Sequence, residues 1–156
     1  MKKLAIIICL VAGFNIVKAQ SNKEDIDMIQ AMYGKDKKVL VANFITLEGK
    51  QKDEFWKLYD EYETARKNTG RKRLALLEKY AAVYDTANNK QIDQLMGQMF
   101  ALQSETDKLI QTYYNKMKLK AGYVTAAKFS QMEAYFASAI RAALLEKIPF
   151  FHQLAE

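Results

Sequence analysis

Apolar residues recur at spacings of three and four along most of the chain, and strict alternation of apolar and polar residues is absent from residue 46 onward. Such spacing collects apolar side chains on one face of a helix. The chain contains one proline, Pro149, and only six glycines, so few residues would interrupt a helix. The pattern therefore predicts an all-α fold.

The first predicted helix spans residues 37–44, and a looser turn precedes it at 25–33. The second begins after Thr46, whose hydroxyl suits the N-cap position, and ends near Asp85. The apolar stripe of this second helix contains Phe55, Leu58 or Tyr59, Tyr62, Ala65, Leu74, Leu77, Ala81 and Tyr84.

The third predicted helix begins near Asn88, which forms with Gln91 the pattern of a capping box, and ends before Gly122. The fourth opens at Thr125 as N-cap and ends before Pro149. The second and third helices would each contain about 30 to 38 residues and measure roughly 45 to 57 Å. Joined by a short turn, they predict a long antiparallel hairpin in an elongated four-helix protein. So thin a body either pairs with a second copy or leaves apolar surface open, and we expect a homodimer.

The first 19 residues have the features of a secretory signal peptide. Lys2 and Lys3 precede an apolar run over 4–17, and Ala19 lies where a signal peptidase would cut. The run is shorter than the ~20 residues that span a bilayer, so we expect export without stable membrane insertion. The expected organisation is a signal peptide at 1–19, a flexible or weakly helical segment at 20–36, a helical domain at 37–150 and a tail at 151–156.

Removal of the signal peptide changes the charge and the cysteine content. The chain has 24 basic residues, of which three lie in the signal peptide, and 18 acidic residues, so 21 and 18 remain and the net charge is +3. The only cysteine, Cys9, is also removed, which excludes disulfides and thiol chemistry. So small a positive charge on an exported chain gives no reason to expect nucleic acid as a partner.

The residues beyond the signal peptide lack the parts of the common catalytic and metal sites. His152 is the only histidine and lies in the predicted tail, so a metal site of the helical-bundle type lacks its nitrogen ligands. No cysteine or glycine-rich phosphate loop remains, and three serines fall on predicted helices: Ser104, Ser130 and Ser138. We therefore expect a protein that is not an enzyme and that binds no cofactor or metal.

Two methionine pairs are the remaining candidates for metal ligands. Met28 and Met32, and likewise Met96 and Met99, are spaced so that each pair shares one helix face. Methionine more often fills gaps in a hydrophobic core, and we favour that interpretation. A soft-metal site stays an alternative.

The start of the second predicted helix combines acidic and aromatic residues. Five carboxylates surround its aromatic residues: Asp53, Glu54, Asp60, Glu61 and Glu63. Phe55, Tyr59 and Tyr62 share another face and should be buried, whereas the carboxylates should face water or the lysines near the end of the third helix. Trp56 lies about 100° from Phe55, between the buried stripe and solvent, and is a candidate contact for a partner.

A run of cations, RKNTGRKR, follows in the same helix. It contains Arg66, Lys67, Arg71, Lys72 and Arg73 and no acidic residue. Glu78 is the one acidic residue expected near it, so the run would present a basic patch to an acidic client or to anionic lipid headgroups. An ordinary solvated face is the alternative interpretation. We take the five cations and Trp56 as the candidate client-binding residues.

Two short sequences, each at the start of a predicted helix, resemble the LTxxQ family of periplasmic proteins, the Spy/CpxP-like group. They are Ile-Thr-Leu-Glu-Gly at 45–49 and Val-Thr-Ala-Ala-Lys at 124–128, with Gly49 and Lys128 where the family has glutamine. Together with the signal peptide and the four helices, the likeness covers about residues 37–150. The resemblance implies a periplasmic, cradle-shaped antiparallel dimer whose concave, basic and partly apolar face holds unfolding proteins without ATP.

The sequence and the resemblance lead to one main hypothesis and two alternatives. The main hypothesis is an exported, ATP-independent client-binding chaperone or envelope-stress adaptor. Its partners would be unfolded or partly folded envelope proteins, or a membrane sensor protein. The first alternative is a periplasmic sensor or accessory domain that binds one specific envelope partner or a metal. The second is a purely structural homodimer.

Overall fold

A computed structural model describes residues 37–145 and 148–151, and these residues form helices but no strand. The helices are α2 (Gly49–Ala81), α3 (Asn89–Lys120), α4 (Tyr123–Leu145) and a helical segment at residues 37–44. The predicted all-α, four-helix fold is therefore confirmed. The predicted signal peptide at 1–19, the segment at 20–36 and residues 152–156 of the predicted tail lie outside the described residues.

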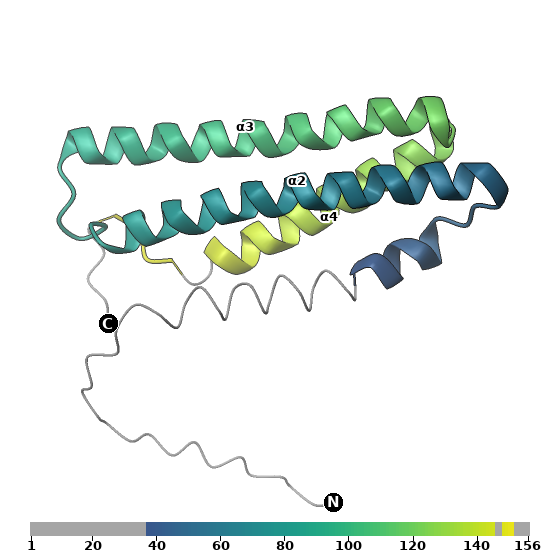
Figure 1. Ribbon diagram of the computed structural model, residues 1–156. Coiled ribbons are helices and arrows are strands. Elements are labelled where there is room, and N and C mark those ends of the chain that lie inside the picture. Colours follow the sequence, from purple (N-terminus) through teal and green to yellow (C-terminus); the bar gives the residue numbers. More distant parts are fainter. Residues whose placement is uncertain (1–36, 146–147, 152–156) are drawn as a thin grey trace, which may run out of the picture.

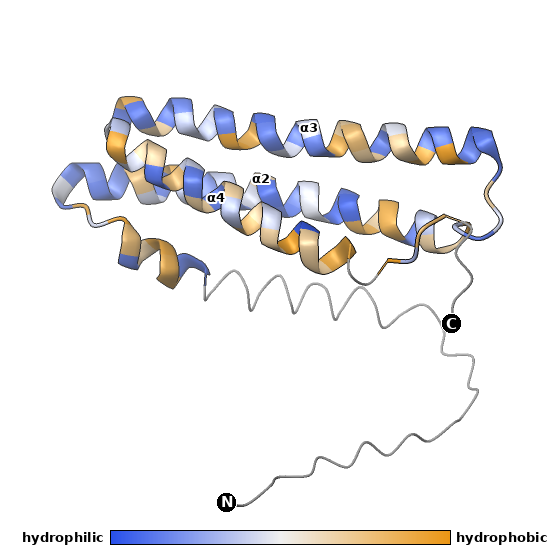
Figure 2. Ribbon diagram, turned by 180° about the vertical axis from the view of Figure 1, so that it is seen from behind, coloured by the Kyte–Doolittle hydropathy of each residue, from blue (hydrophilic) through white to orange (hydrophobic). Residues whose placement is uncertain are grey.

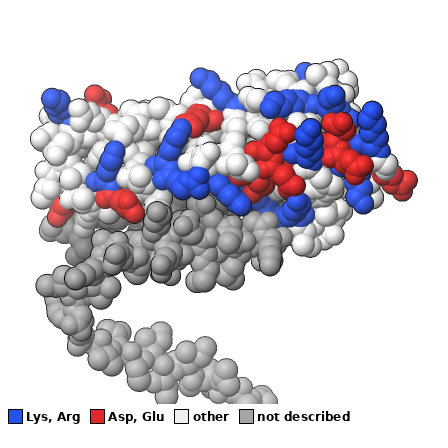
Figure 3. All heavy atoms as spheres, viewed as in Figure 1, with Lys and Arg blue, Asp and Glu red and all other residues white. Residues whose placement is uncertain are grey.

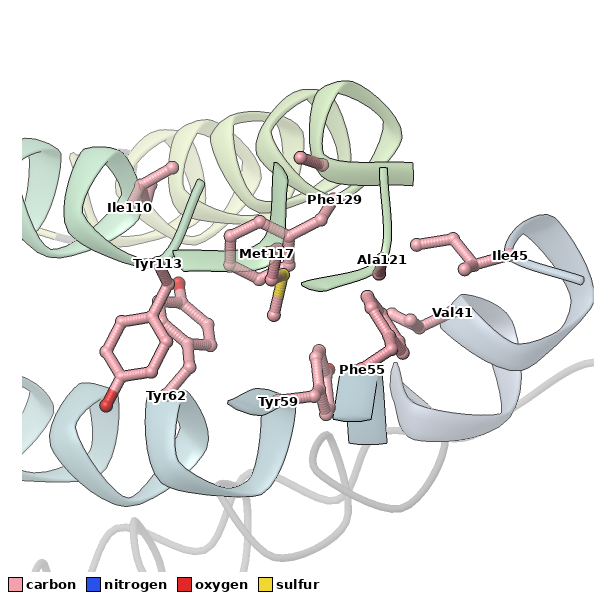
Figure 4. Packing of buried hydrophobic residues seen from close by; sticks show 11 residues of the cluster. Val41, Ile45, Phe55, Tyr59, Tyr62, Ile110, Tyr113, Met117, Ala121 and Phe129 are labelled. Atoms are coloured by element: carbon pink, nitrogen blue, oxygen red, sulfur yellow. The ribbon is translucent and has the colours of Figure 1, made fainter. Parts of the chain in front are cut away.

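The long antiparallel hairpin predicted from the sequence is formed by α2 and α3 (Figure 1). They contain 33 and 32 residues, so each is about 50 Å long. A tight turn after α3 leads into α4, which runs back obliquely along one side of the hairpin (Figure 1). The helical segment at 37–44 lies beside the first half of α2, where it packs into the same core (Figure 4). The predicted homodimer stays a prediction.

The ends of α3 agree with the sequence analysis. The side chain of Asn88 accepts a hydrogen bond from the backbone N–H of Gln91 at 3.0 Å, and the side chain of Gln91 accepts one from the backbone N–H of Asn88 at 2.9 Å. The predicted capping box is thus confirmed. Beyond the other end, Gly122 has φ +90°, a conformation that glycine adopts without the strain of a side chain.

The predicted N-caps of the second and fourth helices are wrong. Residues 45–48 are not helical, because Ile45 is buried in the core and Leu47 packs against it, so α2 begins only at Gly49, after Glu48. Thr46 therefore lies outside the helix. Thr125 is a buried residue inside α4, because α4 already begins at Tyr123, directly after the turn.

Two clusters of buried side chains hold the helices together. The larger lies toward the end of the molecule where α2 begins (Figure 4). Its buried members are Val41, Ile45, Phe55, Tyr59, Tyr62, Ile110, Tyr113, Met117, Ala121, Ala126 and Phe129. Phe55, Tyr59 and Tyr62 are at most 2% exposed, which confirms their predicted burial. The smaller cluster is aliphatic and lies toward the α2–α3 turn, with Leu76, Leu95 and Leu102 as its buried members.

The aromatic rings of the larger cluster meet mostly edge to face. The ring of Tyr62 lies 5.0 Å from that of Phe129 on α4 and 5.4 Å from that of Tyr113 on α3, centroid to centroid, with interplanar angles of 88° and 69°. This arrangement favours aromatic pairs electrostatically and adds to the burial of their area. One residue of α2 thus connects all three long helices.

We predict that Asn88→Ala lowers the free energy of unfolding by about 1 kcal/mol, because the first turn of α3 loses its cap. The midpoint of thermal unfolding, followed by circular dichroism at 222 nm, should fall by a few degrees. Asn89→Ala is the matched control, because Asn89 is exposed and already helical. Equal midpoints for Asn88→Ala and wild type would contradict a stabilising role of the capping box.

Candidate functional site

Four of the five carboxylates near the start of α2 lie on its outer side. Asp53, Asp60 and Glu61 are exposed and Glu54 is half-buried, as expected for a solvated face. Figure 3 shows acidic residues gathered toward the end of the molecule where α2 begins, interleaved with lysines and arginines. Glu63 is the exception and corrects the expectation, because its side chain is only 13% exposed and takes part in a buried ion cluster.

The cluster is centred on the ammonium group of Lys37, the first described residue. Its Nζ donates hydrogen bonds to Oε1 of Glu63 on α2 at 2.7 Å and to Oε2 of Glu133 on α4 at 2.6 Å. The side chains of Lys37 and Glu133 are only 7% and 2% exposed. Because buried charges are costly unless paired, the two contacts fix the segment at 37–44 against both helices.

Arg66 completes the pairing of Glu63. Its Nε donates to Oε1 and its Nη2 to Oε2 of Glu63, both at 2.8 Å, which is the bidentate geometry of strong arginine–carboxylate pairs. Burial disfavours the charge of Glu63, but the hydrogen bonds and positive charges of Arg66 and Lys37 outweigh it and hold the pKa of Glu63 below its usual value. Glu63 therefore stays ionised in the folded protein at neutral pH.

The carboxylate of Glu133 is more deeply buried than that of Glu63. Burial raises the pKa of Glu133 above its usual value, although Lys37 and the hydrogen bond from Tyr62 act in the opposite direction. The hydroxyl of Tyr62 donates to Oε2 of Glu133 at 2.7 Å, and burial raises the pKa of that hydroxyl, so it remains a neutral donor. Oε1 of Glu133 and the hydroxyl of Tyr59 are buried without a hydrogen-bond partner among the described residues.

The predicted basic patch is partly neutralised within the fold. Besides Arg66, Lys72 has an acidic partner, because its Nζ lies 2.6 Å from Oε1 of Glu105 on α3. The expectation that Glu78 would be the one acidic residue near the run is therefore wrong, since the facing helix supplies Glu105 and the same helix supplies Glu63. The Lys72–Glu105 pair depends on how α2 and α3 lie against one another, whereas Glu63 and Arg66 are three positions apart on the same helix.

The remaining three cations of the run differ in exposure. Nη2 of Arg73 lies 3.3 Å from the hydroxyl of Thr106, and its guanidinium is half-buried between the helices. Arg71 is exposed and hydrogen-bonds to Asn68 on the same helix. Lys67 is exposed as well. Of the predicted run, Lys67 and Arg71 thus remain as exposed cations that are not paired with a carboxylate in the described part of the chain.

Trp56 lies between the buried stripe of α2 and its solvent-facing side, as predicted from the sequence. It is half-buried, and its ring meets those of Phe55 and Tyr59 edge to face at centroid distances of 5.1 and 5.5 Å. Nζ of Lys38 lies 5.2 Å from the centre of its ring, within the range of a cation–π contact. Trp56 therefore contacts the helical segment at 37–44, and its role in binding a partner stays a prediction.

Two open grooves run along α3. One, of about 660 Å³, lies between α2 and α3 and is lined by Arg71, Lys72, Glu105 and Lys108 among others. The other, of about 650 Å³, lies between α3 and α4. The apolar and aromatic residues that line this second groove are Phe100, Ile110 and Tyr114. Its other lining residues are polar or charged, so the basic groove and this groove of mixed character lie on either side of α3, and Lys108 borders both.

The described residues offer neither a cluster of metal ligands nor a membrane-spanning helix. Among them, no group of three or more His, Cys, Asp and Glu residues could hold a metal ion. Met99 packs against the aliphatic cluster, consistent with core packing, while Met28 and Met32 lie outside the described residues. No helix within the described ranges is both long and apolar enough to cross a bilayer. Comparison of the sequence with protein-family models, curated proteins and solved structures gives no match.

The sequence analysis missed Lys37 and Glu133, although each left a signal. Glu133 is the only acidic residue of α4 and follows Phe129 by four positions and precedes Phe136 by three, so it lies on the apolar face. Lys37 precedes the buried Val41 by four positions. A lone charge on an apolar face indicates a buried ion pair. The sequence could not show that the two charges are partners.

We predict that Glu63→Gln lowers the free energy of unfolding at neutral pH by about 3 kcal/mol, because Lys37 and Arg66 lose a buried counter-charge. Since the pKa of Glu63 is below its unfolded value, its stabilisation is present above that unfolded value and is lost as the pH falls through the folded pKa. The difference between wild type and variant should therefore shrink in acid. Urea unfolding at a series of pH values, followed by circular dichroism, measures it.

Asp60→Asn is the matched control on the same helix. Its carboxylate binds Nζ of Lys38 at 2.6 Å, but the two side chains are 48% and 60% exposed, so the loss should stay below about 1 kcal/mol. Equal losses for the two variants at neutral pH would contradict the special contribution of the buried cluster.

Proposed function

We propose that this chain is an exported, ATP-independent protein that holds unfolded or partly folded envelope proteins on an apolar and basic helical surface. The observation that carries the proposal is the outer face of α4. Only Lys128, Glu133 and Arg141 are charged in this helix of 23 residues, and Glu133 is buried. The outer face therefore offers mainly small and apolar side chains to solvent.

The most exposed apolar residues of α4 lie on one side of the helix. Tyr123, Val124 and Tyr135 are 70–72% exposed, and they span about 120° of the helix circumference. Figure 2 shows hydrophobic segments along α4 and over residues 37–44, whereas much of α2 and α3 is hydrophilic. Exposed apolar residues that gather on one face, rather than scatter singly, are typical of interaction surfaces.

The outer face of α4 continues into the groove between α3 and α4. Ser130, which lines that groove, neighbours Ala127 and Ala134 on the helix surface. The opposite wall carries Phe100, which is 67% exposed. Face and groove together form a shallow surface, here called the α4 surface and defined by Phe100, Tyr123, Val124, Ser130 and Tyr135. A shallow surface without deep pockets suits clients of varied sequence.

The basic groove on the other side of α3 supplies the charge. Arg71, Lys72 and Lys108 line it, and Glu105 is its one acidic lining residue. Such an excess of positive charge would attract acidic segments of a client at a distance and would be screened by salt. Encounter through the basic groove and retention on the α4 surface would need no catalytic group and no nucleotide.

A client-binding protein of this kind should suppress the light scattering of an unfolding test protein at substoichiometric to equimolar ratios. The triple variant Phe100→Ser, Val124→Ser and Tyr135→Ser should need several-fold more protein for the same suppression, because apolar area is lost from the α4 surface. Its control is the triple variant Gln51→Ser, Gln94→Ser and Gln98→Ser, in which the replaced side chains are exposed and polar. Absence of suppression by folded wild-type protein at any ratio would refute the function.

The contribution of charge is tested separately with Lys67→Gln and Arg71→Gln, the two exposed cations of the run that are not paired with a carboxylate in the described part of the chain. The double variant should suppress the light scattering of the test protein less than wild type does at low ionic strength. At high salt, the two proteins should suppress it equally. Lys79→Gln with Lys90→Gln is the control, because it removes the same charge near the α2–α3 turn. Suppression limited to one of several unrelated test proteins would instead favour the alternative of a sensor or accessory domain with one envelope partner.

A further inference from the structure

The ammonium group of Lys37 lies within a set of groups that is typical of cation recognition. Its Nζ is 5.8 Å from the ring centre of Tyr59, 5.4 Å from that of Tyr62 and 5.3 Å from that of Phe136. All three distances fall within the reach of cation–π attraction. Together with the carboxylates of Glu63 and Glu133, the three rings surround the ammonium group with partners from α2 and α4.

This arrangement exceeds what an ordinary ion pair needs. A single carboxylate balances one ammonium charge, whereas here two carboxylates and three aromatic rings converge on it. Glu63 is already balanced by Arg66, so Glu133 supplies the charge that remains for Lys37. In addition, Oε1 of Glu133 is a buried acceptor without a partner in the described part of the chain, so the site keeps hydrogen-bonding capacity for a cation.

None of these five groups belongs to the segment that carries Lys37. Tyr59, Tyr62 and Glu63 come from α2, whereas Glu133 and Phe136 come from α4. The aromatic core beneath them holds both helices without the lysine, because Tyr59 and Tyr62 each pack edge to face on Phe129 of α4. The two long helices therefore build the site, and residue 37 fills it from a separate element.

We propose that Tyr59, Tyr62, Glu63, Glu133 and Phe136 form a binding cage for a primary alkylammonium group, which Lys37 occupies from within the chain and which an external amine occupies when the lysine is absent. The external ligand is either a free small amine or the lysine side chain of a bound protein. This proposal concerns a site distinct from the α4 surface and does not depend on the proposed client binding.

Chemical rescue tests the cage directly. Lys37→Ala removes the outer carbons and the ammonium group of the lysine, which together have the size of n-propylammonium. The variant should unfold roughly 10 °C below wild type, because Glu133 loses its counter-charge. n-Propylammonium chloride should recover a large part of that loss with saturable dependence, while sodium chloride at equal ionic strength should not. The midpoint of wild type should not respond to the amine.

Two further variants separate cage binding from general effects of the salt. Lys37→Met keeps an unbranched apolar stem in the cage but lacks the charge, so n-propylammonium should give no rescue. Lys37→Ala combined with Glu133→Gln keeps the space but loses the charged acceptor, and rescue should again disappear. If Lys37→Ala alone is unfolded in sodium chloride, recovery of the helical signal at 222 nm on addition of the amine replaces the shift in midpoint.

Trp56 offers a local readout, because it is the only tryptophan and its ring contacts Lys38, next to the cage. Its fluorescence in Lys37→Ala should titrate with n-propylammonium over the same range as the thermal shift. The same titration with a tripeptide that is capped at both ends and has a central lysine shows whether the external amine is a lysine side chain. Its norleucine analogue, which lacks the ammonium group, is the control. Binding of both amines assigns lysine side chains as ligands, and binding of n-propylammonium alone assigns free small amines. Absence of a response to either amine would overturn the proposal.

Discussion

The buried contact of the Lys37 ammonium group with Glu133 and Glu63 is the interaction that ties the segment at 37–44 to both α2 and α4. This contact joins a short helical segment to the middle of two long helices, and Val41 and Ile45 add apolar packing against the same core. A buried charge without its partner is far more costly than a lost surface pair. The cluster therefore restricts the ways in which the segment, α2 and α4 can be arranged, more than apolar contacts of similar area would.

The elongated shape explains where the apolar residues lie. Two helices of about 50 Å cannot enclose one deep core, so burial divides into an aromatic cluster toward one end and a smaller aliphatic cluster toward the other. A thin body also has much surface for its volume, and part of the apolar sequence of α4 remains on that surface. The same geometry that limits the core thus supplies the face on which we propose that clients bind.

Charge has two separate uses in this fold. Near the start of α2 and along its outer face, acidic and basic residues are exposed and contribute mainly to solubility, because surface pairs stabilise little (Figure 3). Toward the interior, Lys37 pairs with carboxylates of α2 and α4 and so positions helices, whereas Arg66 pairs with Glu63 of its own helix. The division means that a basic run in the sequence overstates the basic surface of the folded protein. Only part of RKNTGRKR faces solvent as free positive charge, and the adjacent groove gains Lys108 from α3 instead.

The sequence by itself determined the helices, because their signals are local. Apolar spacing placed α2 and α3, predicted the burial of Phe55, Tyr59 and Tyr62, and the pair Asn88 and Gln91 marked a helix start. Tertiary structure alone decided the ion cluster, because Lys37 and Glu133 are 96 positions apart and no local pattern relates them. It also decided the starts of α2 and α4, where packing of Ile45 and the turn at Gly122 outweighed the capping preference of threonine. Local propensity acts within a few residues, whereas pairing of buried charges is selected only when the helices pack.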